Sequence, residues 1–185
     1  MSFRIEEKIL VSENHKFLLR EYLSTKNAKM IYKPRQILSL YFDNNNFEMF
    51  KDSEEGIVPR KKIRIRTYPK SNENYALEEK ISSIEGRFKT VKMINKKDFE
   101  KFTKNGIFDV KYGHCKPKIF VKYNREYLSI GSTRLTIDTN ITFLNLSKKT
   151  IGKEHNSVLE LKTNYKRPKE DLMLEFPFMR TRFSK

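Results

Sequence analysis

The sequence predicts an α+β fold in which eight mostly antiparallel strands form a barrel, with a few flanking helices. Eight segments alternate β-branched or aromatic residues with polar ones, which is the pattern of half-buried strands. Two short turns, Glu85-Gly86 and Gly131-Ser132, would join neighbouring segments as antiparallel hairpins. The 185 residues contain no repeat and no Gly/Ser-rich or Pro-rich linker, so we expect a single domain over 1–185.

The strands and loops follow from this alternation along the chain. Strands are expected at 2–11, 36–43, 60–68, 74–84, 86–93, 118–130, 133–140 and 157–164. The stretches between them are expected to be loops, at 44–58, 105–117 and 142–156, with some helix at 46–51.

Helices are expected at 13–24, 95–104 and 169–175. Ser12 and Asn95 are the candidate N-caps of the first two helices. In the first helix, Phe17, Leu18 and Tyr22 would form one apolar stripe.

The charge balance points to the kind of ligand. The chain has 39 Lys and Arg against 23 Asp and Glu, a formal net charge of +16, which makes a polyanion the expected partner. The single Cys115 excludes an intramolecular disulfide and a Cys-based zinc site, and is typical of a reducing compartment such as the cytoplasm. We expect neither a transmembrane helix nor a signal peptide, because apolar runs of the required length are missing. A membrane partner is left open.

Basic residues gather on one face of five expected strands. Side chains of one parity share a face, so the four basic even-numbered residues of 60–66 lie opposite Ile63 and Ile65. Strands 2–11, 74–84, 133–140 and 157–164 repeat this design. The nine basic residues of the shared surface are Arg4, Lys8, Arg60, Lys62, Arg64, Arg66, Lys80, Arg134 and Lys162.

Two interpretations of this surface are open. For any one strand, a sheet with one solvated side is the usual explanation. Repetition over five strands favours a tunnel, because like charges along one face repel unless an anion lies between them. In the tunnel the charges face the lumen and helices cover the apolar outer faces. Arg and Lys side chains would then pair with the oxygens of a linear phosphate chain.

Three glutamates, Glu6, Glu78 and Glu160, share the basic faces. Carboxylates repel phosphate directly, but they suit a divalent metal, Mg²⁺ or Mn²⁺, that bridges phosphate oxygens. The alternative is that each glutamate pairs with a neighbouring Lys or Arg.

An ordered set of motifs extends from residue 4 to residue 185. The set comprises Arg4-Ile-Glu-Glu-Lys8, Ser39-Leu-Tyr-Phe-Asp43, Arg60-Lys-Lys-Ile-Arg-Ile-Arg66, Leu77-Glu-Glu-Lys80, Tyr123-Asn-Arg-Glu126, Arg134-Leu-Thr-Ile-Asp138, Leu159-Glu-Leu-Lys162 and the terminal Ser184-Lys185. It resembles the VTC domain, the polyphosphate polymerase domain of the vacuolar transporter chaperone complex and its bacterial relatives. The resemblance implies a triphosphate tunnel fold related to the CYTH triphosphatases. It also implies ATP and a divalent metal as ligands, and transfer of the γ-phosphate onto polyphosphate.

The resemblance also implies roles for single residues. Phosphate contacts are implied for Lys8, Lys62, Arg64, Arg66, Lys80, Arg125, Arg134 and Lys162. Glu160 would be the metal carboxylate. Ser184 and Lys185 match the family's closing Ser-Lys-Tyr, although here the chain stops before the Tyr. One further cation is expected from strand 86–93, either Lys89 or Lys92.

Two positions depart from simple expectation. Parity places Arg125 with Val121 and Tyr123 on an expected apolar face, so either a bulge shifts the register or Lys122 and Asn124 face outward. CYTH enzymes open with Glu-x-Glu-x-Lys, and here Arg4 replaces the first Glu. Losing that carboxylate favours phosphate binding and a polymerase over two-metal hydrolysis.

For a polymerase, we expect Lys62, Arg64, Arg66 and Lys80 to hold the nucleotide triphosphate, with Arg60 on the same face. Lys8, Arg125, Arg134 and Lys162 would stabilise the transferring phosphoryl group and the acceptor. The rival functions are a tunnel triphosphatase, a polyphosphate-binding sensor and a nucleic-acid binder. The last is disfavoured because the basic run at 60–66 alternates with Ile in the rhythm of a strand, unlike a flexible basic tail.

Overall fold

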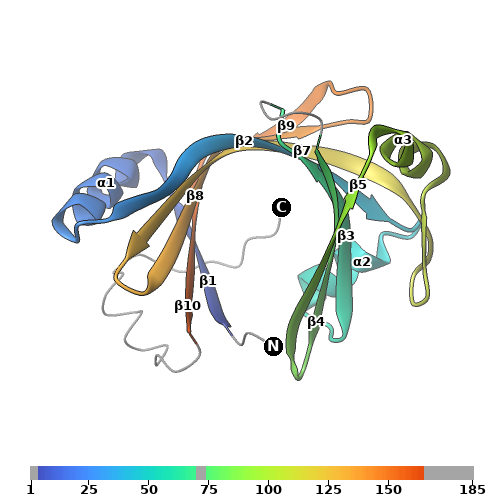
Figure 1. The fold of residues 1–185 in the computed structure, drawn as a ribbon, viewed down its shortest axis with the longest axis horizontal. Helices are drawn as coiled ribbons and strands as arrows, with labels where there is room; N and C mark the ends of the chain where they lie inside the picture. Colours follow the sequence, from blue (N-terminus) through green and yellow to red (C-terminus); the bar gives the residue numbers. More distant parts are fainter. Residues whose placement is uncertain (1–3, 70–73, 165–185) are drawn as a thin grey trace.

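The computed structural model describes residues 4–69 and 74–164 of the chain (Figure 1). The helix expected at 169–175, and the site residues Ser184 and Lys185, lie outside the described residues. No helix in the described ranges has both the length and the apolar character needed to cross a bilayer.

The described chain forms one antiparallel sheet of ten strands with three α-helices and a short 3₁₀ turn. The elements are β1 (Arg4–Val11), η1 (Glu13–His15), α1 (Lys16–Thr25), β2 (Lys29–Asp43), α2 (Glu48–Glu55), β3 (Arg60–Thr67), β4 (Tyr75–Ser83), β5 (Gly86–Ile94), α3 (Lys96–Asn105), β6 (Ile107–Asp109), β7 (Gly113–Ile130), β8 (Thr133–Leu144), β9 (Thr150–Glu154) and β10 (Ser157–Asn164).

The sheet is an open arch, so the expected eight-stranded barrel is wrong in strand number and in closure. Its order is β1-β10-β8-β7-β2-β3-β4-β5, with β6 on β7 and β9 on β8. Among the described residues β1 and β5 end this order without pairing to each other. Figure 1 shows the strands curving around a central opening. The two extra strands, β6 and β9, lie in the stretches 105–117 and 142–156 that were expected to be loops.

The helices cover the outer side of the arch, as expected for a sheet with a polar inner face (Figure 1). Leu19 and Leu23 of α1 pack on the apolar face of β1, β7, β8 and β10. The stripe expected on this helix is wrong, since Phe17 is 75% and Leu18 50% exposed. The buried stripe is instead Leu19 and Leu23, one helical turn apart, with Tyr22 partly buried against the same cluster.

A second outer core packs under α2 and α3. Met49 of α2 is buried together with Ile63 and Ile65 of β3, and the α3 aromatics pack against the same cluster. The Asp43 carboxylate accepts hydrogen bonds from the Met49 and Phe50 amides at 3.0 and 2.9 Å, which fixes the start of α2 against the end of β2. Asn95 caps α3 as expected, because its side chain accepts from the Asp98 amide at 2.8 Å.

The bulge near Arg125 lies in β8 and not in β7. Lys122 pairs with Thr142 and Asn124 with Thr139, so β8 carries one extra residue here, and Asn140 has φ 54°. β7 itself keeps its alternation: Tyr123 and Arg125 share the inner face, while Lys122 is exposed. Of the two expectations for Arg125, the outward-facing Lys122 is the correct one.

Candidate functional site

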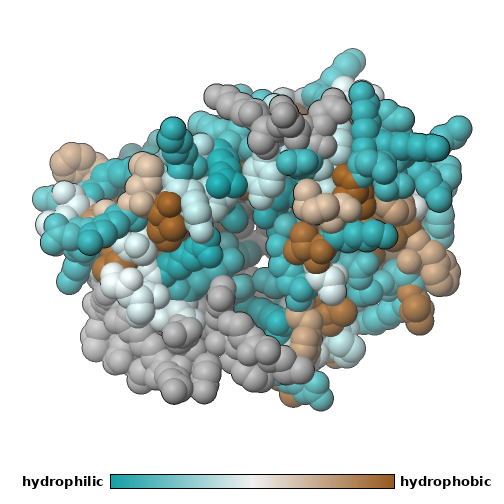
Figure 2. All heavy atoms as spheres, in the orientation of Figure 1, coloured by the Kyte–Doolittle hydropathy of each residue, from teal (hydrophilic) through white to brown (hydrophobic). Residues whose placement is uncertain are grey.

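The concave face of the arch encloses a cavity of about 490 Å³. Its lining includes ten basic side chains and five acidic ones, an excess of five positive charges among the described residues. In the orientation of Figure 1, hydrophilic residues dominate the visible face of the molecule, including the hollow near its centre (Figure 2). The basic members of the lining are Lys8, Arg60, Lys62, Arg64, Arg66, Lys80, Arg87, Lys89, Arg125 and Lys162.

Strand register places like charges side by side in this cavity. Lys62 of β3 pairs with Lys80 of β4, which pairs with Lys89 of β5, so three lysines form a row across three strands. Like charges directly opposite one another destabilise a sheet. Burial lowers the pKa of Lys62 to about 8, and the positive charges of Lys8 and Arg60 add to this effect. Two members of the row have a carboxylate partner, since Lys80 donates to Glu6 at 2.9 Å and Lys89 to Glu78 at 2.8 Å.

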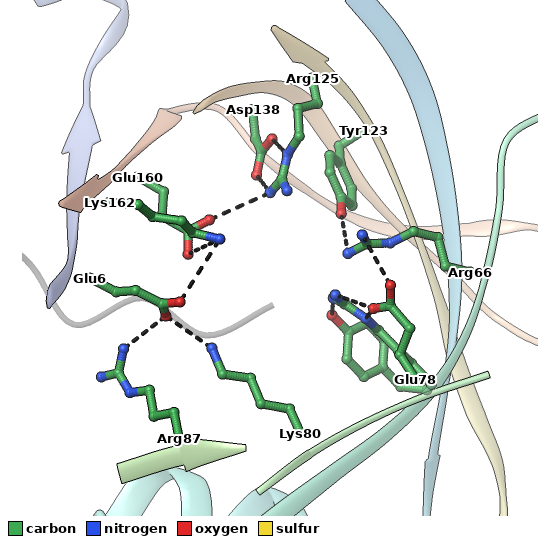
Figure 3. A network of polar contacts seen from close by, with 12 residues as sticks. Glu6, Arg66, Glu78, Lys80, Arg87, Tyr123, Arg125, Asp138, Glu160 and Lys162 are labelled. Carbon is green, nitrogen blue, oxygen red and sulfur yellow. Dashed lines mark hydrogen bonds and ion pairs between the residues drawn. The ribbon is translucent and has the colours of Figure 1, made fainter. Parts of the chain in front are cut away.

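Glu78 of β4 is the counter-ion of cations on the neighbouring strands β3 and β5, which form one wall of the cavity (Figure 3). Its carboxylate accepts from Arg64 Nε at 2.7 Å and from Lys89 Nζ at 2.8 Å, and Arg66 Nη1 lies 3.4 Å away. Burial alone would raise the pKa of Glu78, but Arg64, Arg66 and Lys89 lower it to about 2. The structure favours the ion-pair interpretation for this glutamate, since both oxygens are already paired.

Two tyrosines orient the arginines of the same wall. Arg64 Nη1 donates to the Tyr41 hydroxyl at 3.0 Å, and Arg66 Nη2 to the Tyr123 hydroxyl at 3.5 Å. Arg66 is only 7% exposed, and its Nε has no hydrogen-bond partner among the described residues. A buried N–H without an acceptor is costly unless a ligand supplies one.

Glu6 spans the gap between the two ends of the sheet. It lies on β1, and its Oε2 accepts from Lys80 of β4 at 2.9 Å and from Arg87 of β5 at 2.8 Å, as Figure 3 shows. Lys162 lies 3.9 Å from its other oxygen. Ion pairs thus connect β1 to β4 and β5 where backbone pairing is absent from the described residues.

Glu160 differs from the other two glutamates. It is 8% exposed. Its nearest cationic partners in the described part of the chain are at ion-pair distance only, Lys162 at 3.6 Å and Arg125 at 3.8 Å. Arg125 is instead held by Asp138 in a bidentate pair at 2.6 and 2.7 Å. Burial would raise the pKa of Glu160, but the surrounding cations, Lys162 first, lower it to about 2. This carboxylate is ionised and keeps oxygens available for another ligand.

A family model for the VTC domain matches residues 3–185, nearly the whole chain. The chain belongs to the VTC domain family. No curated protein sequence matches it.

Solved structures share the fold of this VTC domain at low sequence identity. A putative adenylate cyclase from Bacillus halodurans is 15% identical with a TM-score of 0.66, covering 100% of this chain and 95% of its own. A putative adenylate cyclase from Vibrio parahaemolyticus is 13% identical with a TM-score of 0.59, covering 99% and 95%. A putative adenylyl cyclase from Hippeastrum, described as having a dominant triphosphatase activity, is 17% identical with a TM-score of 0.57, covering 94% and 84%. These neighbours support the triphosphate tunnel fold.

The structure gathers most, but not all, of the sequence-predicted residues of the VTC domain. Apart from Arg134 and the two terminal residues outside the described ranges, every predicted site residue lines the cavity. Arg134 does not line it: its guanidinium lies 5.7 Å from the centre of the Tyr32 ring. Between the two lysine candidates of β5, Lys89 lines the cavity and Lys92 does not. The roles of these residues stay predictions.

Sequence reasoning missed several side chains of the cavity. Arg87 has the parity of Lys89 on the same expected strand, so alternation could have found it. Tyr41, Tyr123 and Asp138 stood within the motifs, but nothing in their spacing marked them as partners of Arg64, Arg66 and Arg125.

No group of three or more His, Cys, Asp or Glu side chains that could hold a metal occurs in residues 4–69 and 74–164. A site made by protein ligands alone is therefore not supported in this part of the VTC domain. Glu160 fits a different arrangement, in which one carboxylate and the oxygens of bound phosphates share Mg²⁺ or Mn²⁺, because its oxygens are not hydrogen-bonded to the cations around it.

Proposed function

We propose that this VTC domain is a polyphosphate polymerase that binds ATP in the cavity and transfers its γ-phosphate onto a polyphosphate chain. The observation that carries the proposal is the buried guanidinium of Arg66. Among the described residues its Nε–H has no acceptor, and it faces a cavity with five excess positive charges. Such a cavity binds a compact polyanion, and a triphosphate supplies one acceptor oxygen after another along its length.

The binding roles follow from the wall on which each cation lies. Arg64 and Arg66 are two residues apart on β3, about 6.6 Å along the strand, so both can contact one triphosphate. Their guanidinium groups can each bind two phosphate oxygens, whereas Lys62 and Lys80 act as point charges. Arg60, Lys89 and Arg87 lie around them in the lining.

The opposite wall suits the transferring phosphoryl group and the acceptor. Lys8 and Lys162 flank Glu160, and Arg125 is oriented by its bidentate pair with Asp138. Phosphoryl transfer requires positioning and charge stabilisation more than covalent chemistry, and a terminal phosphate acceptor is already ionised, so no general base is required. Arg134 lies beside this wall rather than in it.

Glu160 is the residue that would hold Mn²⁺ or Mg²⁺, with Glu6 and Glu78 acting as counter-ions of the lysines and arginines. When bound, such a metal would neutralise negative charge on the phosphate groups.

A triphosphatase is the second candidate, since a structural neighbour from Hippeastrum is described as having that activity. Arg4 at the first position of the opening motif favours the polymerase, because a two-metal hydrolytic site would lose a carboxylate there. A nucleic-acid binder is less well supported, because the even-numbered basic residues of the run 60–66 line an inner cavity rather than an outer face.

The products formed from ATP and Mn²⁺ separate these functions. A polymerase yields a ladder of polyphosphate on a gel, stained in situ and destroyed by an exopolyphosphatase. A triphosphatase yields free phosphate in stoichiometric amounts. Protein that forms neither product, but binds RNA with a steep salt dependence, would overturn both assignments.

A further inference from the structure

Arg35 on β2 is a basic residue outside the cavity lining but directly beside it. The sheet register pairs Arg35 with Arg125, which lines the cavity. Cross-strand partners share a face of the sheet, with Cβ atoms about 4.5–5.5 Å apart. Arg35 therefore continues the basic inner surface by one strand, from β7 to β2.

The guanidinium groups of the two paired arginines have different partners. Arg125 has the bidentate pair with Asp138, whereas no ion pair to Arg35 occurs among the described residues. Instead, three tyrosine rings hold the Arg35 guanidinium: Tyr32 at 5.6 Å, Tyr68 at 5.8 Å and Tyr127 at 5.6 Å from the ring centres. Tyr32 and Tyr127 pack edge to face, with their centres 5.7 Å apart.

Within residues 4–69 and 74–164, the guanidinium of Arg35 makes no side-chain hydrogen bond in this cage. Contact with an aromatic face is a weak electrostatic attraction and uses none of the five N–H donors of a guanidinium. Arg134 lies over Tyr32 at 5.7 Å and brings a second cation to the same cluster. With both guanidinium groups on its ring, Tyr32 is a poor platform for stacking a nucleobase. The N–H donors of Arg35 suit an anion instead.

We propose that Arg35, held by Tyr32, Tyr68 and Tyr127, forms an additional phosphate subsite next to Arg125. It would bind phosphates of a linear polyphosphate that extend beyond the triphosphate held by Arg64 and Arg66. This inference rests on the proposed function and deepens it, because it gives the growing chain a binding site of its own.

Binding of two inorganic ligands to Arg35→Gln tests the subsite. Inorganic tripolyphosphate is short enough for the cavity, and size-fractionated long-chain polyphosphate reaches beyond it. The variant is expected to bind the long chain about tenfold more weakly, the effect of losing one charge-assisted contact, and tripolyphosphate almost as well as wild type. The slope of log affinity against log salt should fall by just under one for the long chain only.

Three further variants sharpen the test. Lys122→Gln removes one positive charge from the outer face of the same strand pair, where the side chain is exposed, and should leave both affinities unchanged. Tyr32→Leu removes a ring that lies against both guanidinium groups and should weaken long-chain binding, whereas Tyr32→Phe keeps the ring face and should not.

An equal loss of affinity for both ligands in Arg35→Gln would overturn the subsite, and so would no loss for either. Wild-type protein that binds neither ligand would remove the proposed function together with the subsite. Wild-type protein that makes no polymer, but shows the length-dependent effect of Arg35→Gln, would remove the polymerase assignment and support the subsite.

Discussion

Replacing Glu78 by Gln should make the ligand-free protein less stable and its phosphate site stronger. Glu78 is 5% exposed and accepts from Arg64 and Lys89, with Arg66 at 3.4 Å. Removing its charge leaves these three cations facing one another without a carboxylate. The loss of folding stability is expected in the ligand-free protein, because a bound triphosphate supplies oxygens that replace those of the Glu78 carboxylate.

The size of the effect follows from the pKa of Glu78. A fall from 4.5 to about 2 corresponds to about 3 kcal/mol of stability at neutral pH. Because the folded pKa is depressed, this stability is present above pH 4.5 and is lost as the pH falls through about 2. Without ligand, the variant should melt roughly 6–12 °C below wild type at pH 7. Tripolyphosphate should bind at least about tenfold more tightly to the variant, since a charge about 4 Å away is worth up to about 4 kcal/mol at an effective dielectric constant of 20.

The assay is thermal unfolding with and without tripolyphosphate, at pH 7 and at low pH. Glu79→Gln is the matched control: the residue is adjacent but pairs with Lys61 at 3.3 Å, its side chain is 34% exposed, and such a pair contributes less than about 1 kcal/mol. Glu78→Gln protein that melts with wild type, or gains no more than wild type from tripolyphosphate, would refute the counter-ion role.

Three further predictions concern single residues of the cavity. Arg66→Ala should lower ATP-dependent polyphosphate synthesis roughly 10²–10³-fold in a turnover assay, with Arg66→Lys restoring only part, because Lys cannot make the bidentate contact. Glu160→Gln should abolish the Mn²⁺ dependence of turnover, and an unchanged metal titration would leave Glu160 as an ion-pair partner alone. Calorimetry slightly above pH 8, in two buffers of different ionisation enthalpy, should show proton uptake on tripolyphosphate binding. The reason is that free Lys62 has a pKa of about 8 and a bound anion raises it, so Lys62→Arg should show no uptake.

Alternation predicted which face of the five basic strands would bear the cavity, for a physical reason. A small sheet cannot bury rows of Lys and Arg in an apolar core, so parity alone separates Lys62, Arg64 and Arg66 from Ile63 and Ile65. The same rule decides between Lys89 and Lys92 once the register of the hairpin is known, because Lys89 pairs with Lys80.

The features that could not be predicted from the sequence depend on strand register and on pairing between strands that are distant in the chain. β2 begins seven residues before the expected strand and carries two irregularities around Tyr32, so the ring that contacts Arg134 could not be placed from a local pattern. The extra residue in β8 near Asn140 reverses the facing of that strand, and periodicity alone does not report a bulge. Closure also depends on the two end strands, which share no backbone pairing in the described chain and are joined by the Glu6–Arg87 ion pair.

The carboxylates of the cavity explain how so basic a site can exist without its ligand. Glu6, Glu78 and Asp138 each contact arginine or lysine at hydrogen-bonding distance, so the empty protein avoids much of the repulsion among ten lining cations. A phosphate chain must therefore displace or share these partners, and binding energy is spent on that exchange. The cations that need no displacement are those without a carboxylate at hydrogen-bonding distance, and among the described residues Arg35 meets this condition beside the cavity through its aromatic cage. A chain long enough to reach Arg35 gains a contact that costs the protein no ion pair, so affinity should rise with chain length faster than it would for a cavity of fully paired cations.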